Sequence, residues 1–283
     1  MPKYAKVMLS GESLLSGRRK YYFEEKVGDK VKLILIILFL LLVFLISYMV
    51  YLAFGNNVLV HLIETSGIQE TYNVFFISDT HNRLIHSSVI ERIQGNVNCI
   101  IIGGDFVDHR TSLNKIEENL KLLTAVAPTY FVWGNNDREI PEEQFIPLLT
   151  KYNVQIINND SMLIHDGRNK IRLCAIDIKG TDEMIVQSIQ KCEEDEHILF
   201  VSHDPHHFKK VINYITPLLL LGGHIHGGQI RLGRFGFFQK GSFGPFYGTY
   251  QLISNGYGTT LVPLRLGAKA ESHIIQIHFR EKK

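Results

Sequence analysis

Cysteine is scarce in this chain, and its placement fits neither a metal knuckle nor a disulfide framework. The 283 residues include three cysteines, Cys99, Cys174 and Cys192, with no Cys-x-x-Cys spacing among them. An odd count leaves at least one thiol outside any disulfide. Cys99 and Cys174 lie in apolar runs, where we expect them to be buried as small hydrophobic residues. The cysteines therefore do not indicate the compartment of the protein.

An excess of positive charge is missing from most of the chain. Residues 1–32 hold 8 Lys and Arg and 4 Asp and Glu, a net charge of +4. Residues 33–283 hold the remaining 22 Lys and Arg and 24 Asp and Glu, which gives them a net charge of −2. Proteins that bind a nucleic-acid backbone usually present a basic surface to it. We therefore expect no nucleic acid as a partner, and the composition disfavours a nuclease.

Charge is absent altogether from one long apolar run, residues 33–54. As a helix it would span about 33 Å, which is enough to cross the hydrocarbon core of a bilayer. Three lysines lie between residues 26 and 32, whereas the next Lys or Arg after the run is Arg83. By the positive-inside rule we expect a single-pass cell-membrane protein with a cytoplasmic N-terminus and with the part of the chain after the run outside the cytoplasm.

A cleaved signal peptide and a twin-arginine export signal are the alternatives for this N-terminal region. The apolar run is longer than a signal peptide requires, and residues 52–55 lack the small-x-small pattern of a cleavage site. Arg18 and Arg19 lie far from the run, which is unlike a twin-arginine signal. We divide the chain into a poorly ordered cytoplasmic tail (1–32), a transmembrane anchor (33–54), a linker (55–70) and one large domain (71–283).

Beyond the linker, strand and helix patterns alternate at first, and strand patterns predominate at the end. We expect helices over residues 84–94, 112–126, 141–152, 181–192 and 206–214, with Ser112 as an N-cap and Pro141 in a first turn. We expect strands over residues 74–77, 99–102, 130–133, 154–157, 162–164, 171–176, 198–201, 218–221, 229–232, 249–253 and 272–279. This order is typical of two facing mixed sheets with helices outside.

Five of the predicted strands are each followed by a short polar segment. These segments are Asp79-Thr80-His81, Gly104-Asp105-Phe106-Val107-Asp108, Gly134-Asn135-Asn136-Asp137, His203-Asp204 and Gly223-His224-Ile225-His226. Taken singly, such an Asp could be a helix cap and such a His a surface residue. In α/β sheets, however, ligands bind beyond the carboxyl ends of neighbouring strands, so the side chains can converge. Their mixture of oxygen and imidazole donors suits Mn, Fe, Zn or Mg.

The ordered series resembles the calcineurin-like metallophosphoesterase superfamily, whose motifs are D-x-H, G-D-x-x-D, G-N-H-D or G-N-H-E, a lone His, and G-H-x-H. The match runs from about Tyr72 to Phe279, and Gly227, Gly228 and Gln229 resemble the membrane-associated bacterial branch of the family. The resemblance implies a four-layer α/β-β/α sandwich of two mixed sheets with flanking helices and with metals at the sheet edge. Here that fold would follow an N-terminal transmembrane helix.

The resemblance also implies a role for each motif residue at a site for two divalent metal ions. The first metal would be held by Asp79, His81 and His226, the second by Asn135, His203 and His224, and Asp105 would bridge the two, since a bridge needs a two-oxygen anion. We expect Asp108 to orient a histidine ligand and Asp137 to brace its own loop. Two such ions clamp a phosphoryl group and activate water, so that hydroxide attacks phosphorus in line with the leaving group.

One position departs from the family pattern. Asn136 stands where the family has a histidine that protonates the leaving oxygen or contacts the phosphate, and an amide cannot donate a proton to an alkoxide. Three explanations stay open: a leaving group that needs no acid, as in a pyrophosphate; a substitute acid such as His206 or His207; or a protein that turns over poorly. We place Asp105, Asn136 and His206 among the candidate catalytic residues.

Aromatic residues gather directly after the last motif, where residues 233–248 contain five Phe and one Tyr. This segment either folds onto its own core or presents an apolar rim to lipid or to the acyl part of a substrate. We predict a membrane-anchored, two-metal hydrolase of phosphodiester or pyrophosphate bonds, with a lipid-linked or envelope phosphoester as a candidate substrate. The main alternative is a metal-binding sensor or assembly protein with weak turnover. Metal identity, natural substrate and oligomeric state stay open.

Overall fold

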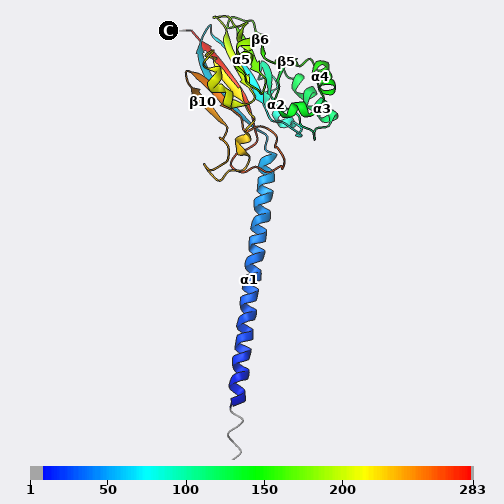
Figure 1. Cartoon of the computed structure of the whole chain (residues 1–283), viewed down its shortest axis with the longest axis vertical. Helices are drawn as coiled ribbons and strands as arrows, with labels where there is room; N and C mark the ends of the chain where they lie inside the picture. Colours follow the sequence, from blue (N-terminus) through cyan, green and yellow to red (C-terminus); the bar gives the residue numbers. More distant parts are fainter. Residues whose placement is uncertain (1–8, 282–283) are drawn as a thin grey trace, which may run out of the picture. The chain divides into compact units, whose positions relative to one another are not determined.

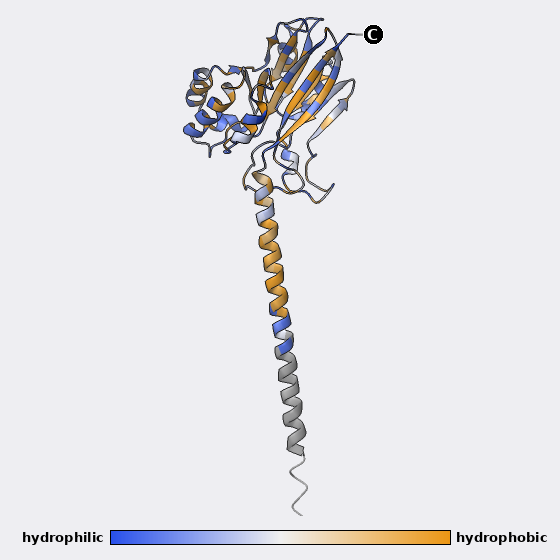
Figure 2. Cartoon of the chain, turned by 180° about the vertical axis from the view of Figure 1, so that it is seen from behind, coloured by the Kyte–Doolittle hydropathy of each residue, from blue (hydrophilic) through white to orange (hydrophobic). Residues whose placement is uncertain are grey.

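The computed structural model describes residues 9–281, with side chains described from residue 28 onward and at Lys26. The chain divides into two units, Met1–Tyr48 and Met49–Lys283. Helix α1 (Leu9–Ala53) makes up the first unit and enters the second with its last turn. Its segment Gly28–Ala53 is apolar and long enough to cross a membrane, a test that a signal sequence also passes (Figure 2).

The N-terminal tail differs from the expectation of poor order. Residues 1–8 lie outside the described part of the chain, but α1 is helical from Leu9 onward. Residues 9–32 contain no proline, and a helix that already exists extends at little cost per residue. The apolar run therefore serves as the nucleus from which the preceding residues continue the helix.

The second unit contains two six-stranded mixed sheets that face each other, with helices on their outer faces (Figure 1). The first sheet has the order β1 (Asn57–Ser66), β12 (Glu271–Arg280), β2 (Glu70–Ile77), β3 (Cys99–Gly103), β4 (Thr129–Val132) and β5 (Gln155–Ile156). The second has the order β10 (Ser242–Phe246), β11 (Thr249–Ile253), β9 (Leu219–Gly222), β8 (His197–Ser202), β7 (Ile171–Ile176) and β6 (Asp160–His165). The helices are α2 (Ser87–Ile93), α3 (Leu113–Thr124), α4 (Glu142–Lys151), α5 (Asp182–Ile189) and α6 (Phe208–Val211).

Strand β2 shows how the sequence builds these layers. Val74 and Phe76 belong to the core between the two sheets, whereas Phe75 and Ile77 belong to the core under α2, α3 and α4. Successive side chains of a strand point to opposite faces, so a continuous apolar run is needed where both faces are covered. Helices α5 and α6 cover the outer face of the second sheet in the same way. The four-layer α/β-β/α sandwich is confirmed.

Three predicted segments differ in the structure. Residues 57–66 of the expected linker form β1, which pairs in parallel with β12 at the edge of the first sheet. Only Val58 and Ile63 are fully buried there, so the strand lacks the alternation that marks a half-buried strand. The aromatic segment contains β10, another edge strand. The strand expected at residues 229–232 makes only isolated bridges, from Ile230 and Leu232.

Candidate metal centre

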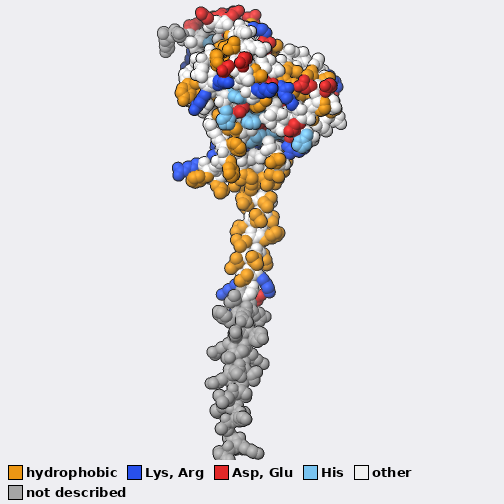
Figure 3. Space-filling view, viewed as in Figure 1, with side chains coloured by type: hydrophobic (Ala, Val, Ile, Leu, Met, Phe, Trp, Pro, Cys, Tyr) orange, Lys and Arg blue, Asp and Glu red, His pale blue; other side chains and the backbone are white. Residues whose placement is uncertain are grey.

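The five polar segments all follow strands of the sandwich, and side chains from four of them form two groups. They come after β2, β3 and β4 of the first sheet and after β8 and β9 of the second, which run parallel within each sheet. In each group the ligand atoms lie within 4.8 Å of one another. The groups are Asp79, His81 and His226, and Asp105, His203 and His224. Histidine side chains are seen together on the face of the domain drawn in Figure 3.

The first group brings two imidazole nitrogens and one carboxylate oxygen to a single point. The Nε2 atoms of His81 and His226 are 3.1 Å apart, and His226 Nε2 is 3.2 Å from Oδ1 of Asp79. Asp79 is fixed in turn, because its Oδ2 accepts a hydrogen bond from Ser78 and its Oδ1 accepts one from the backbone N–H of His224. All three ligand side chains are buried, as expected for donors that share a cation.

The second group contains two buried nitrogen atoms that make no hydrogen bond within the described residues. His203 donates from Nδ1 to the carbonyl oxygen of Gly103 at 2.8 Å, so Nε2 is the atom of this ring that could bind a metal. His203 Nε2 and His224 Nδ1 are both buried, and neither has a hydrogen-bond partner among the described residues. Buried polar atoms are rarely left unsatisfied. These two nitrogens, together with a carboxylate oxygen, fit a divalent cation.

Asp105 lies between the two groups. Its Oδ2 is 3.3 Å from Nε2 of His203 in the second group and 4.0 Å from Nε2 of His81 in the first. Its Oδ1 instead accepts the backbone N–H of Asn136 at 2.8 Å. One oxygen therefore faces both groups, whereas the sequence argument had assumed that a bridge would use both oxygens.

The charges of these side chains depend on one another. Burial acts to raise the pKa of Asp79 and of Asp105, but the surrounding histidines outweigh it and hold both pKa values below the usual range. Burial acts to lower the pKa of His203, but Asp105 and Asp79 raise it to about 10. Burial lowers the pKa of His226. Without a metal, a proton on His203 offsets negative charge of the carboxylates. A divalent cation that bound here would displace that proton.

The carboxylate of Asp137 accepts hydrogen bonds both from its own loop after β4 and from the loop after β3 that carries Asp105, and not from its own loop alone as expected. Its Oδ2 accepts the backbone N–H of Asp105 at 2.9 Å and that of Gly134 at 2.7 Å, and its Oδ1 accepts that of Val107 at 3.0 Å. Burial and the nearby Asp105 raise the pKa of Asp137 to about 7, although these bonds oppose the shift. At Gly134, a Cβ would lie 2.3 Å from the Asp105 nitrogen, so the approach of the two loops requires glycine.

Asp108 stands behind His81, at 3.4 Å from its Nδ1 atom. Arg110 donates from Nε to both carboxylate oxygens of Asp108 at 3.1 Å. Burial opposes ionisation of Asp108, but the contacts with His81 and Arg110 hold its pKa below the usual range. The sequence had suggested an orienting role for Asp108 but gave no sign of Arg110.

Five of the six residues in the two groups have a left-handed backbone. The φ angles are 54° at Asp79, 49° at His81, 50° at Asp105, 68° at His224 and 49° at His226. Residues other than glycine adopt this region in only a few per cent of cases, and such strain gathers at functional sites. No feature of the sequence predicted it.

The remaining candidates occupy different surroundings. Asn135 is exposed, and its amide nitrogen donates to Oδ1 of Asn136 at 2.6 Å. Asn136 donates to Oε1 of Glu139 at 2.9 Å, while the other oxygen of Glu139 lies 2.8 Å from Nδ1 of His109. This contact between His109 and Glu139 was not predicted from the sequence, although His109 directly follows the G-D-x-x-D motif.

His206 and His207 have other partners. His206 Nδ1 lies 2.7 Å from Oδ1 of Asp204, and 75% of the His206 side chain is exposed. His207 Nδ1 lies 3.0 Å from Oγ of Ser202, and the residue is half-buried. Of the histidines that could replace the missing acid, His109 is therefore the one that shares a hydrogen-bond network with Asn136.

Comparison with known proteins identifies the family. Residues 73–232 match the Calcineurin-like phosphoesterase superfamily domain. The uncharacterized protein YpbG of Bacillus subtilis (strain 168) is 34% identical over 228 residues, which cover 79% of this chain and 88% of YpbG. The uncharacterized metallophosphoesterase YkoQ of the same organism is 28% identical over 72% of this chain and 83% of its own length.

Two more distant proteins are also similar to this chain. Phosphodiesterase YaeI of Escherichia coli (strain K12) is 26% identical over 57% of this chain and 63% of its own length. A proposed 5′-nucleotidase from Staphylococcus aureus is 10% identical, with a TM-score of 0.50 over 75% of this chain and 55% of its own, and supports the fold alone. The ordered motifs, the two groups of ligand atoms and a match over more than half of its length show that this chain belongs to the calcineurin-like phosphoesterase superfamily.

Proposed function

We propose that this protein is a metal-dependent hydrolase of phosphodiester or pyrophosphate bonds. The observation that carries the proposal is the position of Asp105 Oδ2, which lies within 4.0 Å of a histidine nitrogen in each group. A single anionic oxygen between two sets of candidate metal ligands is the arrangement that lets two cations act on one phosphoryl group. The similarity to a protein named a phosphodiesterase supports the reaction class.

Each ligand has a defined role in this proposal. Asp79, His81 and His226 would hold one cation, and His203, His224 and the side chain of Asn135 would hold the other, with Asp105 between them. Because an amide NH2 group is a hydrogen-bond donor without a free lone pair, Oδ1 of Asn135 is the side-chain atom that would bind a cation, while its nitrogen donates to Asn136. When bound, two divalent cations such as Mn, Fe, Zn or Mg would neutralise phosphoryl oxygens and lower the pKa of a water molecule.

The side chains around the ligands keep them in place and supply a proton. Asp137 fixes the two loops that carry Asp105 and Asn135, and Asp108 orients His81. In the place of the missing family histidine, we assign proton donation to His109, which Glu139 holds beside Asn136. An imidazolium can protonate a departing alkoxide, whereas an amide cannot.

The proposal also includes a location. The apolar run of residues 33–54 anchors the protein in the cell membrane in this proposal, and the lysines that precede the run at positions 26, 30 and 32 support an outer position for the catalytic domain. The domain boundaries then become a helical N-terminal region, the span, and a hydrolase domain that begins with β1 at Asn57 rather than after a linker.

The test compares metal content and turnover in three variants of the full chain. Asp105→Asn should lower the occupancy of both cations and abolish turnover of a 4-nitrophenyl phosphodiester. Asp79→Asn should lower mainly one occupancy, and Asp166→Asn, at an exposed position, serves as the control. Two metal ions per chain with normal activity in Asp105→Asn would refute the assignment. A metal-loaded wild-type protein that hydrolyses no diester or pyrophosphate would favour the sensor alternative.

A further inference from the structure

A groove opens beside the second group of candidate ligands. Its volume is 380 Å³, near the lower end of the roughly 300–1,000 Å³ found for small-molecule pockets. Ile225, which lies between His224 and His226 in the sequence, lines the groove together with Ile253 of β11. Both isoleucines are buried and belong to the core under α5 and α6. One side of the groove is therefore a rigid apolar surface that begins at the candidate metal ligands.

Two consecutive phenylalanines also line the groove. Phe237 is 96% exposed and Phe238 is 57% exposed, although aromatic rings are normally covered. The loop that carries them is held by Arg231, a buried side chain that donates to the carbonyl oxygens of Gly227 and Arg234 and also contacts that of Phe238. Gly227 directly follows His226, so these two phenylalanines are fixed to the same loop as the ligands.

Basic groups lie along the same groove. His206 and Lys209 both line it, and His206 is tied through its Nδ1 atom to Asp204, the residue after His203. The groove thus combines an apolar interior with the ammonium group of Lys209 and the imidazole of His206, close to the loop of a candidate ligand. This combination complements a molecule that has a phosphate anion at one end and an apolar chain at the other.

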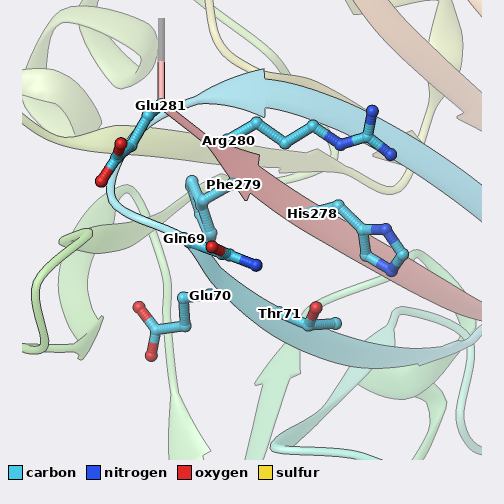
Figure 4. A pocket seen from close by; sticks show the side chains of 7 residues that line it. All are labelled: Gln69, Glu70, Thr71, His278, Phe279, Arg280 and Glu281. Carbon is cyan, nitrogen blue, oxygen red and sulfur yellow. The ribbon is translucent and has the colours of Figure 1, made fainter.

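A larger cavity of 540 Å³ lacks this relation to the ligands. It is lined by Gln69, by the first residues of β2 such as Glu70, and by the last residues of β12 such as Arg280 (Figure 4). The candidate ligands follow the other end of β2, and the cavity lining mixes both signs of charge. Of these two cavities, the groove at Ile225 is therefore the one next to the loops of the candidate ligands.

We propose that the groove binds the hydrocarbon chain of an amphiphilic phosphoester whose phosphoryl group lies at the candidate metal ligands. This inference rests on the proposed function and narrows its substrate to phosphoesters that carry an apolar chain. Binding covers the exposed rings of Phe237 and Phe238, and Lys209 and His206 interact with the anionic end. His206 then has a role in substrate binding rather than in proton donation.

The experiment uses two substrates that share one leaving group, methyl 4-nitrophenyl phosphate and decyl 4-nitrophenyl phosphate. The full chain is placed in phospholipid nanodiscs with the divalent metal that supports the fastest turnover of the methyl ester. Release of 4-nitrophenolate gives kcat/KM for the wild type, Phe237→Ser and Phe235→Ser. Phe235 is the matched control, because it lies in the same loop and is 71% exposed but does not line the groove.

The wild type should prefer the decyl ester, and Phe237→Ser should lose about tenfold of that preference, as expected for one lost aromatic contact. The rate of Phe237→Ser on the methyl ester should equal that of the wild type. Phe235→Ser should match the wild type on both esters. Equal kcat/KM values for the two esters in the wild type would overturn the groove proposal but leave the hydrolase proposal intact. Equal losses in both Phe variants would show that the loop contacts bilayer lipid rather than substrate, and would overturn it too.

A binding measurement separates the two proposals if no ester is hydrolysed. Titration calorimetry with decylphosphonate and methylphosphonate reports chain binding without any reaction. Saturable binding of decylphosphonate that weakens about tenfold in Phe237→Ser, but not in Phe235→Ser, would support the groove even if the hydrolase assignment fails. Equal affinity for the two phosphonates would overturn the groove proposal.

Discussion

Replacing Asp137 by asparagine should release the loop that carries Asp105. The carboxylate accepts three backbone N–H groups, from Asp105, Val107 and Gly134, and it is completely buried. Asparagine has nearly the same shape but only one oxygen acceptor. If that oxygen takes the place of Oδ2, the amide NH2 group faces the N–H of Val107, and two donors then meet in the protein interior.

The magnitude follows from these three bonds. A buried donor without a partner costs about 1–3 kcal/mol, and the two remaining bonds lose the strengthening that an ionised acceptor provides. We expect a total loss of about 2–4 kcal/mol, which corresponds to roughly 30- to 1,000-fold in an opening equilibrium. The loss should be local, because all three donors belong to the loops after β3 and β4.

Hydrogen exchange measured by mass spectrometry checks this loss directly. In the presence of a chelator, peptides that contain Asp105 and Val107 should exchange faster in Asp137→Asn than in the wild type, whereas peptides from β7 and β8 should not change. Asp166→Asn controls for the loss of one carboxylate at an exposed position. Exchange of the Asp105 loop at the wild-type rate in Asp137→Asn would refute the bracing role of Asp137.

Three further outcomes are expected. In a protein that carries His109→Ala, Asn136→His should raise kcat/KM for alkyl phosphodiesters by about tenfold and change aryl esters little, because only poor leaving groups need an acid; equal changes in both classes would place Asn136 away from the leaving oxygen. His109→Ala should lower alkyl-ester turnover by about tenfold or more and spare aryl esters, and a variant with unchanged turnover of both would exclude His109 as the acid. Protease added outside intact cells should digest residues 55–283 and spare the N-terminal region; protection of the whole domain would refute its placement on the outer side.

Local sequence signals were sufficient for the inner strands and the helix caps. The predicted bounds of β7 and β11 match the structure, and Ser112 accepts the N–H of Lys115 as the N-cap of α3. These segments are decided by nearby residues: an apolar run between turns, or a hydroxyl before a helical pattern. The edge strands β1 and β10 were not found, because the exposed positions of an edge strand need not be polar. The partner of β1 also lies more than 200 positions away in the sequence, whereas β10 pairs with β11, which follows it directly.

At the candidate site, too, some features could be predicted from the sequence and others could not. The order of the Asp and His motifs predicted which side chains would meet, and the structure brings Asp79, His81 and His226 together from β2 and β9, more than 140 positions apart. The sequence could not reveal that Glu139 joins His109 to Asn136, since this contact depends on how two loops approach each other. Nor could it reveal backbone strain at the ligands, which is held by tertiary contacts rather than by local propensity.

The position of β12 between β1 and β2 has a consequence for how this protein folds. The first two strands of the domain follow each other in the chain, yet neither pairs with the other; both pair with the last strand. Strand β1 must therefore wait for a partner synthesised more than 200 positions later, and closure of so long a loop is slow. Until then its apolar residues Leu59, Val60 and Leu62 form an unpaired edge that invites aggregation. Loss of the final ten-residue strand would leave the beginning of the domain unassembled, so a ribosome that stops shortly before the end releases a chain that cannot complete its first sheet.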